Sequence, residues 1–372
     1  MNKRLLFPIA MLCVLMASCN RQGEQEPDLD YISIIYCTPT DLTQSLPLEI
    51  DNTADGWQAK YKGAPSKEII RLSPRYSVNE DGDSIVVFDE MIGDKLNGRY
   101  FFGRITNNKY DEPHQYITYK NVKGEAMAEF YATIIKHGDI FVHHDDVAKD
   151  FKLLMLYDAS DPVGCGSQRR DLNFTYLFHE NPKTFTYQFK NEDNFKMVAS
   201  DDGMLRIYDY YSWTGGNGFS ADYYTLTAQY KTKSGVITLD GFEDILLSRM
   251  VDFKGGGFPK CGSLNVYQAT LNGKKHYLVE TVFYDPMPSS FDEKEPDILK
   301  SDGLALFAFT IEKGKLMPSN ILNGKSMIEL VSVDCNDHIR FKYDDKTKTL
   351  QVPQLNANTH EFTGKYKEIK IG

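Results

Sequence analysis

Hydrophobic and polar residues alternate with a period of two along much of this chain. The segments 125–136, 184–189 and 338–343 show the pattern most clearly, because every second residue in them is apolar. This alternation predicts strands that bury one face and expose the other. The segment 304–311 is apolar at every position but one, which predicts a central strand that is buried on both faces.

Turn-forming pairs of residues separate these strands. Asp-Gly occurs at 55–56, 81–82, 202–203 and 302–303, and Asn-Gly occurs at 97–98, 272–273 and 323–324. Both pairs favour two-residue hairpin turns, in which the central residues need a positive φ. Many short strands joined in this way predict an antiparallel all-β protein. The body is either sandwich-like or an irregular, propeller-like array, and the irregular spacing of the turns favours the sandwich.

Helices and domain boundaries leave weaker signals. Residues 243–251 have partial helical spacing, which fits a short helix and a strand equally. Residues 158–171 contain Pro162 and no periodic apolar face, which predicts a loop. We therefore divide the chain into a signal peptide (1–18), a flexible tether (19–30), an N-terminal β region (31–160) and a C-terminal β region (161–372). The two β regions also fit one continuous body.

The first residues have the order of a lipoprotein signal peptide. Lys3 and Arg4 supply positive charge, residues 5–16 form an apolar run of 12, and two small residues precede Cys19. A membrane-spanning helix needs about 20 apolar residues, so this run is too short to be one. The pattern predicts cleavage before Cys19 and attachment of a diacylglycerol to its thiol.

The chain is acidic, with 42 basic and 52 acidic residues. Removal of residues 1–18 takes away two basic residues and leaves a net charge of −12. Nucleic acids require a basic footprint on the protein, so this balance argues against nucleic acid as a partner, and equally against anionic lipid. The predicted contact with the membrane is therefore the lipid on Cys19.

Four cysteines follow the lipidation site. They are Cys37, Cys165, Cys261 and Cys335. Four cysteines in an exported protein allow two disulfides with three possible connectivities. None of the four has the spacing of a zinc or redox motif, and the sequence leaves open whether they are bridged, with isolated and partly buried thiols favoured.

From about residue 196 to its C-terminus, the chain resembles a group of uncharacterised outer-membrane lipoproteins of Bacteroidota. The matching segments are SDDGMLRIY (200–208), WTGG (213–216), AQYK (228–231), FTIEKGKL (309–316) and FKYDDKTKTLQVP (341–353). The acidic residues Glu24, Glu26 and Asp28 also resemble the surface-export signal of such lipoproteins. The resemblance implies an outer-membrane location, with the body in the periplasm or outside the cell, and it implies no reaction.

Residues 208–224 are the densest aromatic stretch of the chain and include a glycine-rich loop. Its candidate binding residues are Tyr210, Tyr211, Trp213, Tyr223 and Tyr224. Such side chains pack a core, or they form a platform on which a sugar or a partner protein stacks. Glycines beside them let a ligand approach the backbone closely. If the platform exists, we expect Trp213 to be at least partly exposed.

No catalytic set is recognisable in the sequence. The run His143-His144-Asp145-Asp146 contains metal-ligand types, but adjacent residues on a strand point to opposite faces, so we predict no metal and no cofactor. These observations favour a non-enzymatic envelope protein that binds a glycan or a partner protein. The alternative is a carbohydrate hydrolase that uses a pair of Asp or Glu residues, which sequence cannot single out.

Overall fold

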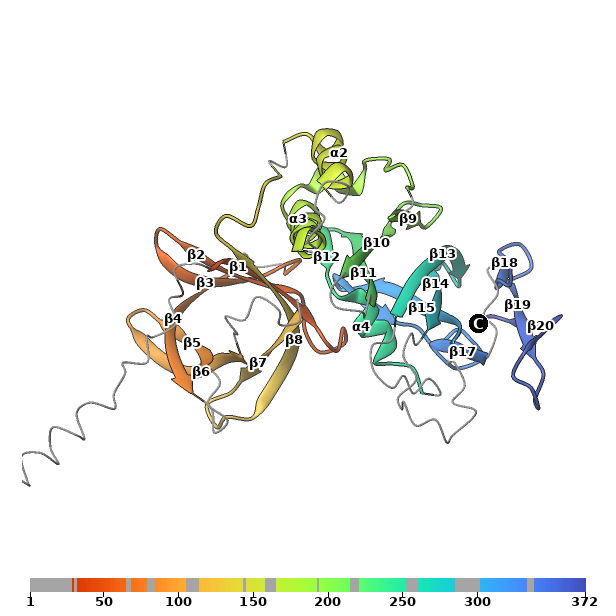
Figure 1. Cartoon of the computed structure of the whole chain (residues 1–372). Coiled ribbons are helices and arrows are strands. Elements are labelled where there is room, and N and C mark those ends of the chain that lie inside the picture. The colour runs from red at the N-terminus through yellow and green to blue at the C-terminus, as the bar shows by residue number, and fades with distance from the viewer. Residues whose placement is uncertain are drawn as a thin grey trace, which may run out of the picture.

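Strands dominate the structure of this protein (Figure 1). The computed structural model describes residues 29, 32–64, 68–78, 84–104, 114–142, 145–157, 165–192, 194–214, 221–251, 260–284, 302–332 and 338–372. All strand pairs in this part of the chain are antiparallel, and they form a closed barrel and several open sheets. The predicted antiparallel all-β class is therefore confirmed.

Residues 32–136 form an up-and-down barrel. Each strand pairs with the next, and the first pairs with the eighth to close the ring. The strands are β1 (Ile32–Pro39), β2 (Leu48–Thr53), β3 (Gly56–Tyr61), β4 (Ile69–Val78), β5 (Ser84–Ile92), β6 (Lys95–Arg104), β7 (His114–Lys120) and β8 (Ala126–Lys136). Closure removes the free edges of the sheet. The sequence analysis did not predict this barrel, because alternation and turns look the same in a barrel and in a sandwich.

Apolar side chains fill the interior of the barrel. Their largest members are Trp57, Phe88, Phe101, Tyr119 and Phe130. Small residues at Ala128 and Ala132 on β8 share this interior, as the alternation in 125–136 predicted. An eight-stranded barrel is just wide enough for side chains to fill, so this interior is a packed core.

Two stacked sheets form the centre of the second body. One has the order β12-β11-β10-β9, and the other runs β13-β14-β15-β16, with β17 also paired to β15. The strands are β9 (Phe195–Ala199), β10 (Leu205–Thr214), β11 (Ala221–Thr232), β12 (Gly235–Leu239), β13 (Lys260–Leu271), β14 (Lys274–Tyr284), β15 (Asp302–Glu312), β16 (Lys315–Pro318) and β17 (Met327–Ser332). Stacked sheets of this kind fit the predicted sandwich-like packing.

Strand β15 lies at the centre of this body. Its alternate residues Phe307 and Phe309 face the β9–β12 sheet, and Leu304 and Leu306 face the opposite side. The predicted central strand 304–311, buried on both faces, is therefore confirmed. Gly303, at the start of this strand, leaves no room for a side chain, because a Cβ there would lie 2.1 Å from the carbonyl oxygen of Leu330.

Two helices cover the outer face of the β9–β12 sheet (Figure 1). They are α2 (Val147–Tyr157) and α3 (Cys165–Glu180), and the shorter α4 (Phe242–Leu247) matches the helix candidate at 243–251. The loop predicted at 158–171 was wrong from residue 165 onward. The polar start of α3 hides its periodicity, and only Phe174, Leu177 and Phe178 near its end carry the apolar spacing. No helix in the described part of the chain is long and apolar enough to cross a bilayer.

The strand predicted at 184–189 was also wrong. This segment begins in the 3₁₀-helix η3 (Pro182–Phe185), which Asn181 caps by accepting a hydrogen bond from the Lys183 N–H. Proline at the first helical position and Asn at the cap favour this turn over a strand. The alternating Phe185 and Phe189 are buried, as predicted. Phe189 packs against Phe151 of α2 and Phe178 of α3.

A three-stranded sheet covers the outer face of the β13–β17 sheet. It consists of β18 (Lys342–Asp344), β19 (Thr349–Leu355) and β20 (Phe362–Lys370). Leu350 on β19 and Phe341 just before β18 pack against Leu278 and Leu304 of the neighbouring sheet. The strand predicted at 338–343 therefore begins only at Lys342. The second body has four layers, in the order helices, sheet, sheet, sheet (Figure 1).

The barrel and the second body meet along β1 and α3. The ring of Tyr36 stacks on His179 with centroids 3.9 Å apart, and its hydroxyl donates to Glu180 at 2.9 Å. The N–H of Asp240 donates to Thr38 Oγ1 at 3.0 Å. We predicted a division near residue 160, whereas the barrel ends at Lys136 and α2 already packs on the second body.

Most of the predicted turns occupy their expected places. Asn272–Gly273 and Asn323–Gly324 have positive φ at both residues, and Gly203 lies in the turn between β9 and β10. Two pairs are exceptions, because 97–98 lies inside β6 and 302–303 forms the start of β15. The pair at 81–82 lies outside the described residues.

The described cysteines are isolated thiols. Cys37 and Cys261 are buried and free, and burial raises the pKa of both well above the usual range. Their preference for the thiol form makes them inert core residues. The side chain of Cys165 and all of Cys335 lie outside the described residues.

Candidate ligand-binding cleft

The predicted aromatic platform lies on two paired strands. Tyr211 on β10 is opposite Tyr224 on β11, and Trp213 is opposite Asp222. The structure describes the backbone of this hairpin but not the side chains of 211–224, nor the loop at 215–220. The roles of Tyr211, Trp213, Tyr223 and Tyr224, and the exposure of Trp213, therefore stay predictions.

Tyr210 belongs to the core, which corrects the prediction for this residue. Its side chain is fully buried, and its ring stacks on Phe174 of α3 with centroids 4.9 Å apart. The hydroxyl lies 3.0 Å from Thr227 Oγ1 and 3.4 Å from Thr175 Oγ1. The ring faces α3 because β10 turns Tyr208 and Tyr210 toward the helices, so it offers no face to a ligand.

A cleft with a volume of about 800 Å³ opens at one end of the second body. It forms where the turns β11–β12, β13–β14 and β15–β16 meet the loop after β3 of the barrel. Its lining consists of Gly63, Met204, Lys231, Thr232, Lys233, Ser234, Lys274, Lys275, Tyr277, Thr310, Ile311, Lys313 and Gly314. We call this site the lysine cleft.

Glycine lets the barrel approach this cleft closely. A Cβ on Gly63 would lie 2.6 Å from Ile237 Cδ1. The φ of Gly63 is +77°. A Cβ on Gly314 would lie 3.4 Å from the carbonyl oxygen of Gly63. Both conditions favour glycine at position 63, because other residues rarely adopt this backbone conformation and would clash here.

Asp202 fixes the base of the lysine cleft. Its carboxylate accepts hydrogen bonds from Ser200 Oγ at 2.8 Å, from the Met204 N–H at 3.0 Å and from Lys275 Nζ at 2.8 Å. Tyr277 donates its hydroxyl to the same carboxylate at 3.3 Å. Burial alone would raise the pKa of Asp202, but these donors outweigh it and the pKa is lowered. The ion therefore ties the β9–β10 turn to β14 across the two sheets.

Five ammonium groups line the cleft, and they fall into two classes. Lys275 pairs with Asp202, and Lys274 pairs with Glu312. Lys231, Lys233 and Lys313 are exposed, and no acidic side chain of the described residues lies within salt-bridge distance of them. An excess of positive charge therefore gathers at one place in an acidic chain.

Sequence reasoning missed this site. Each lysine lies near a hairpin turn, where exposed lysines are common and protect sheet edges. They lie on three hairpins spread between residues 231 and 313, and only the strand order brings those turns to one end. A signal was present in the segments AQYK and FTIEKGKL, which contain Lys231 and Lys313, but sequence does not show that they meet.

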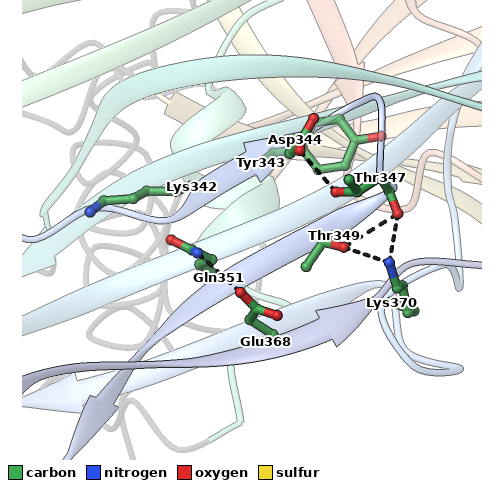
Figure 2. A pocket seen from close by; sticks show the side chains of 8 residues that line it. All are labelled: Lys342, Tyr343, Asp344, Thr347, Thr349, Gln351, Glu368 and Lys370. Atoms are coloured by element: carbon green, nitrogen blue, oxygen red, sulfur yellow. Dashed lines mark hydrogen bonds between the residues drawn. The ribbon is translucent and has the colours of Figure 1, made fainter.

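A second hollow lies on the outer face of the C-terminal sheet (Figure 2). Its volume is about 440 Å³, and its walls include Lys342, Glu368 and Lys370. Lys370 donates to Thr349 Oγ1 at 2.8 Å, and Gln351 donates to Glu368 at 3.2 Å (Figure 2). The side chains of this hollow largely form hydrogen bonds with one another across the strands, so it is a weaker candidate ligand site than the lysine cleft.

Three acids with raised pKa lie in the interior of the second body. Burial raises the pKa of Asp209 to about 6, and it also raises the pKa of Glu280 and Glu243. Asp209 accepts from the Ser263 N–H at 2.9 Å, and Glu280 accepts from Tyr267 at 3.0 Å and from the Phe341 N–H at 2.8 Å. Glu243 lies on α4 and accepts from the Leu226 N–H of β11 at 2.7 Å. None of these three carboxyls is among the residues that line the cleft.

The run at 143–146 is described only in part. His143 and His144 lie outside the described residues. Asp146 instead caps α2, because its carboxylate accepts from the Ala148 N–H at 3.1 Å. Within the part of the chain that the structure describes, no three His, Cys, Asp or Glu side chains are placed to hold a metal ion.

Comparisons with protein-family models, with curated proteins and with solved structures found no match to this chain. The lysine cleft is therefore interpreted from its own geometry and charge.

Proposed function

We propose that this protein is a lipid-anchored outer-membrane protein that binds a glycan in the lysine cleft without transforming it. The observation that supports this function is the cleft itself. Its volume of about 800 Å³ falls within the usual range of ligand sites, which is about 300–1,000 Å³. Met204 and Ile311 give it apolar lining, and lysine and hydroxyl side chains complete the wall.

The shape of the site favours a glycan over a partner protein. Stable protein partners meet over about 800 Å² on each side, in surfaces that are broad. The lysine cleft is a local hollow between hairpins, and a few sugar rings fit a hollow of this volume. The apolar faces of sugar rings match Met204 and Ile311, while ring hydroxyls match the hydroxyl of Ser234.

The acids beside the cleft favour binding over hydrolysis. A glycosidase needs one carboxyl with a raised pKa, which protonates the leaving group. Asp202 and Glu312 are both paired with lysine, and the pKa of both is lowered. Neither of them is suited to act as the general acid.

We expect Ser234→Trp to abolish glycan binding. Ser234 is exposed on the β11–β12 turn and lines the cleft, so an indole at this position fills the opening at little cost in stability. The measurement is a glycan array with residues 20–372, run beside a pull-down from the native envelope. Asn358→Trp, on an exposed turn of the C-terminal sheet, is the matched control and should bind like the parent protein. Equal binding by both variants would place the ligand elsewhere.

The lipid anchor has its own test. We expect the parent protein to take up a palmitate analogue and to pellet with membranes, because Cys19 follows a lipoprotein signal. Cys19→Ala should lose both properties. A Cys19→Ala variant that still takes up label and still pellets with membranes would show that Cys19 is not the lipidated residue.

A further inference from the structure

We infer that the ligand of the lysine cleft is an anionic oligosaccharide that carries carboxylate or sulfate groups on successive sugars. This inference rests on the proposed function, since it names the class of glycan. Its basis is the gathering of five lysines around one hollow, three of them without an acidic partner among the described side chains.

The distribution of these three lysines indicates more than one anionic group on the ligand. Lys231 and Lys233 belong to the β11–β12 hairpin of one sheet, and Lys313 belongs to the β15–β16 turn of the other. A ligand that lies in the cleft meets positive charge from two sheets. A chain with repeated negative charge can pair with both hairpins at the same time.

The two paired lysines play a different part. Lys275 is held by Asp202, and Lys274 by Glu312, so their ammonium groups are already neutralised and fixed in position. They retain free N–H donors, since an ammonium group has three. These donors suit the hydroxyl groups of a sugar, and the anionic groups are left to the lysines that have no acid.

The charge of the whole chain makes the cleft more selective. The formal net charge is −10, so the surface repels polyanions in general. A local excess of positive charge inside a hollow focuses the field there and raises the association rate of an anionic ligand. This attraction is screened by salt, because the screening length is about 10 Å at 0.1 M.

The lining argues against a nucleic acid in the same place. Single strands are held by aromatic side chains on which bases stack. The one aromatic side chain in the described lining is Tyr277, which is only 2% exposed and uses its hydroxyl to bind Asp202. No stacking face is available on it, so an anionic sugar chain fits the site better.

The test compares a charged sugar chain with its neutral methyl ester. Hexagalacturonate and its fully methyl-esterified form have the same rings and length, and calorimetry at 50 mM NaCl measures both against residues 20–372. A heparin-derived hexasaccharide tests sulfate in place of carboxylate, and hexaglutamate tests an acidic peptide. We expect at least one anionic hexasaccharide to bind about tenfold or more tightly than the neutral ester, and its affinity to fall about tenfold at 300 mM NaCl.

A charge-removing variant locates the effect in the cleft. Lys233→Gln combined with Lys313→Asn removes two free ammonium groups, and Asn tolerates the positive φ of 48° at position 313. We expect the pair to lower the affinity for the anionic hexasaccharide about tenfold, with an unchanged melting temperature. Lys346→Gln combined with Lys365→Gln removes the same charge from the exposed C-terminal sheet and should leave the affinity unchanged.

The outcomes separate this inference from the proposed function. Equal binding of the neutral ester, or equal loss in both double variants, overturns the anionic class while glycan binding stands. Tighter binding of hexaglutamate overturns the inference in favour of an acidic peptide. If no oligosaccharide binds here or on the array, the proposed function fails and the inference fails with it.

Discussion

Tyr210→Ala should destabilise the second body by about 3–5 kcal/mol, the usual cost of removing a large buried aromatic side chain. The ring lies between the β9–β12 sheet and α3, where it stacks on Phe174. Its removal leaves a cavity, because neighbouring side chains of a packed core relax only in part. Denaturant unfolding followed by circular dichroism measures the loss.

Tyr210→Phe separates the ring from its hydroxyl. This variant keeps the packing and loses the contact with Thr227, so we expect a cost of about 1 kcal/mol, near that of one buried hydrogen bond. Glycan binding should be unchanged in Tyr210→Phe. A loss of binding without a loss of stability would show that Tyr210 contacts the ligand after all, and it would return this residue to the predicted platform.

Asp209→Asn should stabilise the protein by roughly 2–3 kcal/mol at pH 7.5. Burial raises the pKa of Asp209 to about 6, against the hydrogen bonds of Ser263 and the positive charge of Lys196. In the unfolded chain the pKa of an aspartate is about 3.9. The folded protein therefore disfavours the charged carboxylate, and Asn removes that charge while its amide oxygen still accepts from the Ser263 N–H.

The sign of the pH dependence follows from these two pKa values. Between about pH 4 and 6 the folded state binds more protons at Asp209 than the unfolded state, so the contribution of this group to stability falls as the pH rises. The rise in the pKa of Asp209 from about 3.9 to about 6 corresponds to roughly 3 kcal/mol of folding stability, measured relative to low pH. This stability is fully lost above about pH 6. The gain in Asp209→Asn should therefore be largest at pH 7.5 and close to zero at pH 4.

The measurement is the free energy of unfolding of both proteins between pH 4 and 8. Asp201→Asn, on the exposed β9–β10 turn, is the matched control and should follow the parent curve. A destabilised Asp209→Asn at pH 7.5 would show that the charged carboxylate is needed where it lies, and that its contacts outweigh the cost of burial.

The sequence predicted the strands well and their arrangement poorly. Alternation placed β8 and the central strand β15 correctly, because the period of two depends only on which face is buried. Closure of the barrel depends on the pairing of β1 with β8, and no local pattern reports a contact between Ile32 and Lys136. Helix α3 was missed because its first two turns carry polar residues.

The candidate site shows the same limit more sharply. The aromatic, glycine-rich stretch is conspicuous in the sequence, but Tyr210 within it faces α3. Such a stretch does not show which face of its strand is exposed to solvent. The lysines of the cleft are ordinary one at a time. The strand order brings them together, because hairpins that are distant in sequence reach the same end of the body only after both sheets have formed.

The closure of the barrel by its first and last strands has a consequence for the rate at which the protein folds. Strand β1 can pair with β2 early, but its other edge waits for β8, which lies about a hundred positions further along the chain. Pairing between segments so far apart is slow, because the chain loses loop-closure entropy before the contact forms. An apolar strand with a free edge is prone to join other chains in that interval. The protein should thus be most prone to aggregation before β1 and β8 have paired, and far less afterwards.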